Sequence, residues 1–246
     1  MKRLSFVDCH SHVVPSGDDG AQSVDDGVAL CRGAARHGTA ILFATPHVWP
    51  HLTLTGEREQ EVRAAFEEVR QRAGLDLRLG YELTPTDVLL GEDPRRYVLP
   101  GTRHVLTEVP FLGPVAPLVA LAEHVESFGL VPVVAHPERT ESFLREPTLA
   151  PALAERGWRL QINGTSLLGG DGPHVQALAW SMVESGHAAI VASDGHRTTR
   201  PPHLNAAYAA VRERVGGRGD ALFDGTALGV EPSSRRESSR AALRGA

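Results

Sequence analysis

The chain is poor in cysteine, methionine and aromatic residues. Of its 246 residues, two are cysteine, two are methionine and 5% are Phe, Trp or Tyr. Cys9 and Cys31 alone make no disulfide framework, which excludes the small disulfide-stabilised secreted scaffolds. Positive charge is also scarce, because 25 Lys and Arg stand against 30 Asp and Glu, with no basic run. A general electrostatic attraction to nucleic acid is therefore disfavoured.

Long apolar runs are absent as well. The longest stretches, such as residues 130–135, fall far short of the roughly 20 residues that a membrane-spanning helix needs. The basic start Met1-Lys2-Arg3 is not followed by the apolar core of a secretory signal. We therefore expect a cytoplasmic protein that does not insert directly into a membrane.

Apolar residues nevertheless make up 41% of the chain, which is enough to build one large domain around a core. Seven short β-rich runs recur, at residues 4–8, 39–45, 77–82, 104–109, 130–135, 158–162 and 189–193. Most of the segments between them have the pattern of helices. The clearest are residues 23–37, 57–73, 115–128 and 174–185, each followed by a glycine.

Strands that alternate with helices imply parallel βα units. Seven such units predict an α/β fold that closes, or nearly closes, into a barrel, and a doubly wound open sheet is the alternative. The end of the chain, residues 231–246, is rich in serine and arginine and has few large apolar residues. We predict that this tail is disordered, with a docking arm as the alternative.

Residues that bind metal ions follow the first predicted strand. His10 and His12 are two positions apart, so in an extended chain both side chains point to the same face and can grip one ion. Asp18-Asp19-Gly20 lies a few residues further on, where its carboxylates could hold a second ion. This stretch predicts a metal site at the end of a strand.

The same residue types follow nearly all of the other predicted strands. They are His47, Glu82, Glu108, His136, Asp194 and His196. Any one of them could be an ordinary loop residue. Jointly they indicate a shared metal site, because the catalytic mouth of a βα barrel lies at the carboxyl ends of its strands.

These motifs resemble those of a known superfamily, PHP (polymerase and histidinol phosphatase). The matching residues are Asp8-Cys9-His10-Ser11-His12, Thr45-Pro46-His47, Glu82, Glu108, Ala135-His136-Pro137-Glu138-Arg139 and Ser193-Asp194-Gly195-His196. Asp18-Asp19-Gly20 and Arg200-Pro201-Pro202-His203 make the sequence more similar to the bacterial capsule-type protein-tyrosine phosphatases, the CpsB/CapC family. The resemblance runs from residue 5 to about residue 225.

The resemblance implies a distorted seven-stranded TIM-like barrel, one domain over residues 1–230, that holds three divalent ions, most often Mn²⁺. His10, His12, Glu82 and Asp194 would hold one ion, Glu82 would bridge to a second held by Glu108 and His136, and Asp19, His47 and His196 would hold the third. Four carboxylates against three divalent ions leave a charge of about +2, which suits a phosphate dianion. The mixed imidazole and carboxylate ligands also fit Fe or Zn.

The implied reaction is hydrolysis of phosphotyrosine on a protein, expected to be a bacterial tyrosine kinase that controls exopolysaccharide export. A metal-bound water, as hydroxide, would attack phosphorus. Arg139 and Arg200 lie in loops just past ligand residues, and we expect them to clamp the phosphate oxygens. Trp49 could form an aromatic lip that stacks on a substrate ring, or it could pack on neighbouring helices.

Cysteine-based phosphatase chemistry needs an arginine six residues after the nucleophilic cysteine. The residue six positions after Cys9 is Pro15, and the one after Cys31 is His37, so neither cysteine qualifies. Cys9 is predicted to be a core residue. Three alternatives stay open: a small-molecule phosphatase of the histidinol-phosphatase type, a nuclease module, and a catalytically silent metal-binding regulator. The acidic charge disfavours the nuclease, and nine intact ligand positions disfavour the silent regulator.

Overall fold

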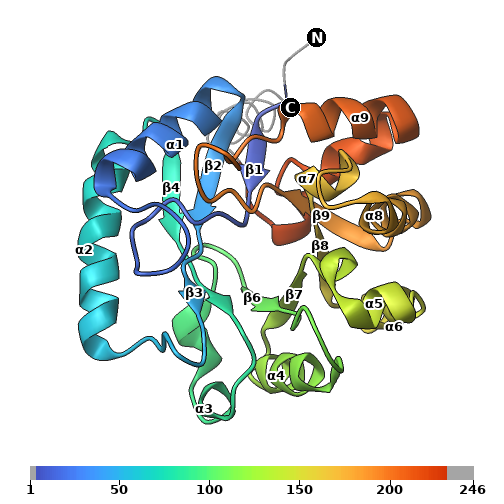
Figure 1. The fold of residues 1–246 in the computed structure, drawn as a ribbon, viewed down its shortest axis with the longest axis horizontal. Helices are drawn as coiled ribbons and strands as arrows, with labels where there is room; N and C mark the ends of the chain where they lie inside the picture. Colours follow the sequence, from blue (N-terminus) through green and yellow to red (C-terminus); the bar gives the residue numbers. More distant parts are fainter. Residues whose placement is uncertain (1–3, 232–246) are drawn as a thin grey trace, which may run out of the picture.

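The computed structural model describes residues 4–231, in which helices surround a central group of strands (Figure 1). The predicted tail, residues 231–246, lies outside these residues except for Glu231. Within residues 4–231, no helix is long and apolar enough to span a membrane.

All of the strand pairs are parallel, and they form two sheets. A three-stranded sheet has the order β1-β2-β4, and a six-stranded sheet has the order β3-β5-β6-β7-β8-β9. The strands are β1 (Phe6–Asp8), β2 (Thr39–Ala44), β3 (His47–Val48), β4 (Asp76–Leu79), β5 (Glu82–Leu83), β6 (His104–Glu108), β7 (Val131–Ala135), β8 (Arg159–Asn163) and β9 (Ala188–Ala192).

The predicted α/β class and its parallel strands are confirmed, but a seven-stranded barrel is not. The second predicted run, residues 39–45, matches β2 alone, and a further short strand, β3, follows it in the other sheet. The third run, residues 77–82, contains most of β4 and the start of β5, which lie in different sheets. Pro46 separates β2 from β3 and has no N–H to continue the ladder. Gly80 separates β4 from β5, where an added Cβ would lie 2.5 Å from the Leu99 side chain.

The segments that follow β1 and β9 are also joined. Ser11 and Gly195 form an isolated parallel bridge, in which the His12 N–H donates to the Gly195 carbonyl at 2.7 Å. The Asp194 N–H donates to the His10 carbonyl at 2.9 Å. These bonds hold the first and last segments with candidate ligands side by side.

The four predicted helices are confirmed to within one residue at each end. They are α1 (Val24–Arg36), α2 (Gly56–Arg72), α4 (Ala116–Ser127) and α8 (Pro173–Ser185). Ser23 and Thr55 cap α1 and α2 by accepting hydrogen bonds from the N–H groups of Asp26 and Arg58, which satisfies a donor that has no partner inside the helix.

The remaining helices are shorter or less regular in pattern. The α-helices among them are α3 (Asp87–Leu90), α5 (Glu141–Arg145), α6 (Leu149–Glu155), α7 (Gly164–Leu167) and α9 (Asn205–Val215). The 3₁₀ turns are η1 (Pro94–Tyr97), η2 (Pro137–Arg139), η3 (Gly216–Leu222) and η4 (Thr226–Leu228). The η2 turn begins directly after His136, so it links a candidate ligand to the candidate clamp residue Arg139.

The buried apolar side chains gather in three clusters. Phe6 of β1 packs in one of them together with Trp158 and Phe223, so this cluster joins the two ends of the described chain. Cys9 is fully buried in another, beside Val7 and Ile41. The prediction that Cys9 is a core residue is therefore confirmed.

A buried histidine far from the predicted site gives the core a pH-dependent component. His104 begins β6, and its Nδ1 has no hydrogen-bond partner within the part of the chain that is described. Burial and the positive charges of Arg159 and Arg103 lower its pKa from 6.5 to about 4. The folded-state pKa of His104 therefore lies below its unfolded-state value. The full stability of the fold is present above pH 6.5, where His104 is neutral, and the free energy of unfolding decreases as the pH falls toward 4.

We expect His104 to reduce the free energy of unfolding by roughly 3 kcal/mol over this pH window, at about 1.4 kcal/mol per pKa unit. The His104→Leu variant should show a flatter stability profile than wild type between these pH values. His174→Gln, which changes an exposed histidine of α8, is the control. Urea unfolding at several pH values measures the difference, and equal slopes for wild type and His104→Leu would contradict the assignment.

Candidate metal centre

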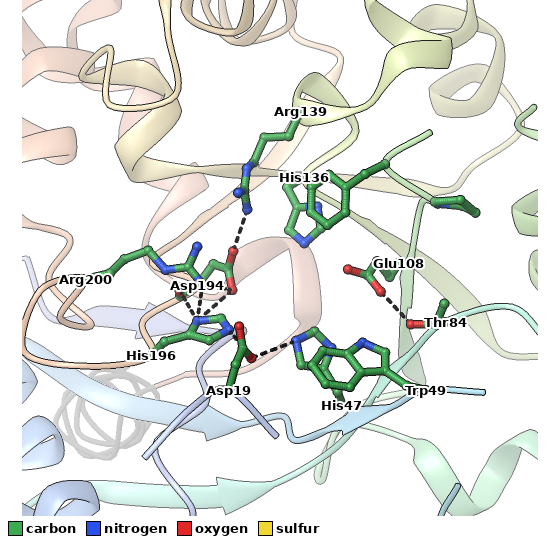
Figure 2. Close-up of a pocket in the computed structure, with 12 residues that line it drawn as sticks. Asp19, His47, Trp49, Thr84, Glu108, His136, Arg139, Asp194, His196 and Arg200 are labelled. Atoms are coloured by element: carbon green, nitrogen blue, oxygen red, sulfur yellow. Dashed lines mark hydrogen bonds and ion pairs between the residues drawn. The ribbon is translucent and has the colours of Figure 1, made fainter. Parts of the chain in front are cut away.

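All nine predicted ligands meet at one end of the parallel strands. Six of them line a cavity of about 410 Å³ together with both candidate arginines: Asp19, His47, Glu108, His136, Asp194 and His196 (Figure 2). The other three, His10, His12 and Glu82, have no exposed surface. The cluster therefore has a buried floor and an accessible mouth.

Glu82 lies at the centre of this cluster. Its Oε2 is 3.0 Å from His10 Nε2, 3.3 Å from His12 Nε2 and 2.9 Å from His47 Nδ1. Its Oε1 is 3.1 Å from His136 Nε2. One carboxylate thus faces four imidazoles with both of its oxygens, as a ligand shared between two ions would.

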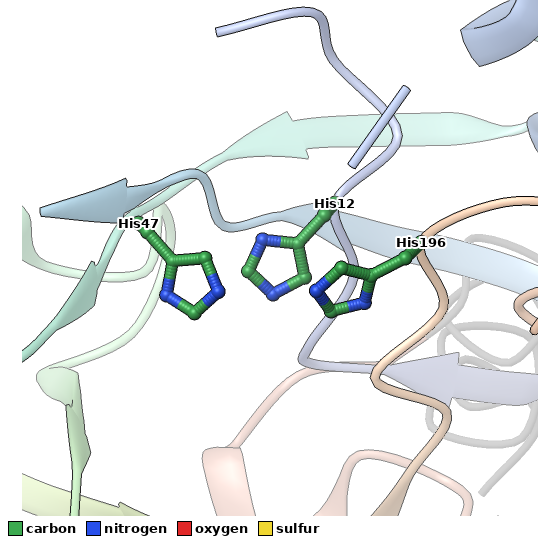
Figure 3. Close-up of side chains that lie close together, drawn as sticks. All are labelled: His12, His47 and His196. Carbon is green, nitrogen blue, oxygen red and sulfur yellow. The ribbon is translucent and has the colours of Figure 1, made fainter. Parts of the chain in front are cut away.

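Four overlapping groups of three side chains are close enough to hold an ion. They are His12, His47 and His196 (Figure 3); His10, Glu82 and His136; His10, His12 and Asp194; and His47, Glu82 and Glu108. In each group the ligand atoms lie within 4.8 Å of one another. These groups include eight of the nine predicted residues.

Asp19 is the ninth predicted residue, and it belongs to none of the four groups found among the described residues. Its Oδ1 is 3.2 Å from His196 Nε2 and 3.6 Å from His47 Nε2, and its side chain is 57% exposed. Asp19 therefore borders the three-histidine group at the mouth, on the side where solvent reaches the cluster.

A chain of hydrogen bonds that the sequence analysis did not identify orients His10. His10 Nδ1 lies 2.9 Å from Gln161 Oε1, so a proton on Nδ1 leaves the Nε2 lone pair directed at Glu82 and the cluster. Gln161 donates to Asn163 at 2.8 Å, and Asn163 donates to Asp194 Oδ2 at 2.8 Å. Both amides lie on one face of β8, and two polar residues spaced by two in an apolar strand are a signal that could have revealed them.

His12 has a similar support from Asp18. His12 Nδ1 lies 3.4 Å from Asp18 Oδ2, which also accepts a hydrogen bond from the His47 N–H. Asp18 Oδ1 accepts from the Gly20 N–H. A side chain at position 20 would collide with the backbone of His12, since an added Cβ would lie 2.4 Å from its carbonyl oxygen. In Asp18-Asp19-Gly20, Asp18 therefore supports His12, Asp19 is a candidate ligand, and Gly20 allows the chain to pass close to the His12 backbone.

Two candidate ligands have an unusual backbone. His136 has a φ of 33° and Asp194 a φ of 50°, and both are left-handed without being glycine. Such a conformation costs on the order of 1–3 kcal/mol, so the surrounding contacts must maintain it. His136 is the first residue after β7 and Asp194 is the second after β9, and this backbone directs both side chains into the cluster.

The cluster contains buried carboxylates that stay ionised, and bound cations would stabilise them. Burial opposes ionisation of Glu82 and Asp194, yet neighbouring histidines, His10 foremost, hold the pKa of both carboxyls well below its usual range. Burial and the charge of Glu82 raise the pKa of Glu108 to about 7. Glu82 Oε2 and His47 Nδ1 lie 2.9 Å apart, and neither has a hydrogen-bond partner among the described residues. A bound divalent ion would satisfy both atoms, so the donor set fits a metal centre.

Both candidate clamp residues lie against Asp194 at the mouth. Arg139 Nη1 donates to Asp194 Oδ2 at 3.1 Å, and Arg200 Nη2 is 3.7 Å from Asp194 Oδ1 and contacts His196. Asp171, which the sequence analysis did not single out, lies 3.4 Å from Arg139 Nε. The two guanidinium groups therefore converge on one wall of the cavity, as a phosphate clamp requires.

Aromatic side chains line the rest of the mouth. Trp49 stacks on His47 with ring centroids 4.1 Å apart, which favours the predicted lip over packing on helices. Arg58 holds this loop from α2, because it donates to the carbonyls of Ser16, Leu52 and His47. Phe111 also lines the cavity, and nothing in its sequence context indicates that position.

Fold and site together define a class of α/β proteins that gather histidines and carboxylates around a cavity at the carboxyl ends of parallel strands. The chain belongs to the family described as capsular polysaccharide synthesis, CpsB/CapC, whose sequence profile matches residues 6–222. The family predicted from the motifs is therefore confirmed.

Two curated relatives illustrate the similarity. The tyrosine-protein phosphatase YwqE of Bacillus subtilis is 32% identical over 225 residues, which cover 86% of this chain and 85% of the relative. The tyrosine-protein phosphatase CpsB of Streptococcus pneumoniae is 25% identical over 226 residues, which cover 87% and 92%.

Solved structures agree with these relatives. A chain from the crystal structures of YwqE and CpsB, described as unique metal-dependent tyrosine phosphatases, matches with a TM-score of 0.77 at 26% identity, covering 90% of this chain and 92% of that one. A phosphotriesterase homology protein from Escherichia coli matches in fold alone, with a TM-score of 0.54 at 9% identity and 91% and 97% coverage.

The central position of Glu82 predicts that its charge is needed to hold metal. We expect Glu82→Gln to lose at least half of the bound divalent metal, because the neutral amide cannot offset the charge of ions beside it. Metal analysis by mass spectrometry after gel filtration measures the content. Glu138→Gln is the matched control, since Glu138 is equally buried but accepts from the Asn163 N–H. Full metal content in Glu82→Gln would contradict the assignment.

Proposed function

We propose that the protein is a metal-dependent protein-tyrosine phosphatase that hydrolyses phosphotyrosine on a protein substrate. One observation supports this most directly: two arginines line the same cavity as the histidine and carboxylate cluster around Glu82. Cations and guanidinium groups on the walls of one cavity suit a phosphate dianion. The names of the relatives point to phosphotyrosine as the substrate.

Three divalent ions, most often Mn²⁺ and alternatively Fe or Zn, are the cofactor that we propose. The candidate ligands are His10, His12, Asp19, His47, Glu82, Glu108, His136, Asp194 and His196. When bound, such ions polarise phosphate oxygens and make water acidic enough to supply a nucleophile. The overlapping groups of ligand atoms around Glu82 support more than one ion.

The chain's own residues bind and orient the substrate. Arg139 and Arg200 are proposed to hold the non-bridging phosphate oxygens in bidentate fashion, and Asp171 keeps the Arg139 side chain in place. The leaving group is a phenolate, whose conjugate acid has a pKa near 10. It therefore depends less on a strong general acid than an alkoxide does.

We infer that the two sheets act as one distorted barrel within a single domain over residues 1–230. The runs that cross between the sheets at Pro46 and Gly80 and the bridge between Ser11 and Gly195 support this. A bacterial tyrosine kinase that controls capsule or exopolysaccharide synthesis is the proposed partner, in keeping with the capsule-synthesis description of the family. The cytoplasmic location stays a prediction.

A turnover comparison tests the proposed function. We expect a phosphotyrosine peptide to be cleaved at least tenfold faster than the matched phosphoserine peptide or histidinol phosphate. We also expect turnover only with added Mn²⁺ or another divalent ion after the protein has been stripped by a chelator. Cleavage of histidinol phosphate alone would replace the proposal with the small-molecule alternative. Turnover that survives complete metal removal would contradict the metal requirement.

Substitution of Arg139 tests the phosphate clamp. We expect Arg139→Ala to raise KM for the phosphotyrosine peptide about tenfold to a hundredfold, because a hydrogen bond to a charged group contributes about 1.5–3 kcal/mol. Bound metal should remain at the wild-type level. Arg145→Ala, which changes an arginine of α5 with a 77% exposed side chain, is the control and should leave KM unchanged. An unchanged KM in Arg139→Ala would show that Arg139 does not hold the phosphate.

A further inference from the structure

Two aromatic rings at the mouth are each stacked on a candidate metal ligand. Trp49 lies 4.1 Å from His47 and nearly parallel to it, at 25°, and Phe111 lies 5.5 Å from His136 at 10°. The two histidines contact different oxygens of Glu82. Both aromatic side chains line the same cavity, and Figure 2 shows Trp49 and His136 on separate sides of it. The two rings therefore form aromatic walls above the cluster.

Phe111 is the aromatic one among the exposed large apolar residues of the described chain, and it is the one of them that lines the cavity. It is 43% exposed, whereas most of the other residues that line the cavity are charged or polar. Pro110 lies beside it in the same wall. This apolar area cannot bind a phosphate group, and it gains most from contact with an apolar or aromatic part of a ligand.

The loop that holds Phe111 is anchored to Glu141 at two points, at Phe111 itself and at Gly113. The Phe111 carbonyl accepts a hydrogen bond from the Glu141 N–H at 2.9 Å, and the Gly113 N–H donates to Glu141 Oε2 at 3.0 Å. A wall fixed in this way loses little conformational entropy when a ligand binds.

Phe111 also lies next to the proposed phosphate clamp. The guanidinium carbon of Arg139 is 5.1 Å from the centre of the Phe111 ring. A group that is joined to a bound phosphate through one ester oxygen must therefore leave the clamp close to this wall. An aromatic group can contact Phe111 there, whereas a short alkyl group offers much less surface.

We propose that Phe111 determines specificity for aryl phosphates by contacting the aromatic ring of the leaving group, with Trp49 as the opposite wall. This inference rests on the proposed phosphatase function. It assigns to Phe111 the selection of an aryl over an alkyl phosphate, while the arginines and the ligand cluster recognise the phosphate that both classes share.

Binding of two phosphonates tests Phe111 without turnover. Phenylphosphonate and methylphosphonate present the same charged group with and without a ring, and calorimetry with the metal-loaded protein measures both affinities. We expect Phe111→Ala to weaken phenylphosphonate binding about tenfold, in line with the contribution of one aromatic contact, and to change methylphosphonate binding less than about twofold. Likewise, Phe111→Ala should lower kcat/KM for phenyl phosphate about tenfold and should change kcat/KM for ethyl phosphate less than about twofold.

Matched variants separate the role in recognition from a role in folding. Phe111→Tyr keeps the ring and should keep the preference, and Phe111→Leu keeps apolar volume and should lose most of it. Leu112→Ala is the control, because Leu112 is the next residue, is 79% exposed and does not belong to the cavity lining within the described chain. It should leave both affinities unchanged.

Three results would overturn the inference. An equal loss of affinity for both phosphonates would mean that Phe111 acts by holding Arg139 or His136. Unchanged affinity for both, or an equal effect of Leu112→Ala, would mean that the wall does not select the ring. If the wild type failed to cleave phenyl phosphate, the proposed function would fail instead, and the two phosphonate affinities would still decide the role of Phe111.

Discussion

The fully buried carboxylate of Glu82 is the constraint on which the mouth of this protein depends. A buried charge without compensation destabilises a fold by several kcal/mol, so polar groups that can offset it must surround it. The imidazoles that face Glu82 come from three separate places, the segment after β1, the start of β3 and the residue after β7, as His10, His12, His47 and His136. Elements that are distant in sequence therefore meet at Glu82, and their meeting creates the cluster.

Polar contacts behind the ligands make the cluster specific in shape. The amides Gln161 and Asn163 connect His10 with Asp194, and Asp18 supports His12. These bonds determine which ring nitrogen faces the cluster, and they help to hold the left-handed backbone of Asp194. The arginines and aromatic walls then lie above a site whose geometry is already determined by its supports.

The sequence predicts which side chains meet in the cluster, because the candidate ligands obey a simple rule. Parallel strands share a carboxyl end, so residues such as Glu108 and His136 must meet once the alternation of strands and helices is recognised. The helices are predicted to within one residue because caps such as Ser23 and stop signals such as Gly38 act locally. The sequence does not predict that β3 and β5 are separate strands in the second sheet, beyond Pro46 and Gly80. Their separation from β2 and β4 depends on which neighbouring strand each one pairs with.

Contacts between loops that are distant in the chain could also not be predicted from the sequence. The position of Phe111 depends on hydrogen bonds to Glu141, 30 residues away in the chain, and no local pattern encodes them. Asp18 and Asp19 are adjacent and chemically identical, and the family resemblance selects only Asp19 as a candidate ligand. No pattern in the sequence predicts that Asp18 supports His12, because that contact depends on the folded position of both residues.

We propose that the cluster around Glu82 binds several divalent metal ions. Anomalous X-ray diffraction from crystals grown with Mn²⁺, with data collected on both sides of the manganese absorption edge, tests this. Separate anomalous peaks are expected within coordination distance of the candidate ligand groups, at least two of them sharing Glu82. An ordered Glu82 with no anomalous peak beside it, in crystals of protein shown to contain manganese, would contradict it.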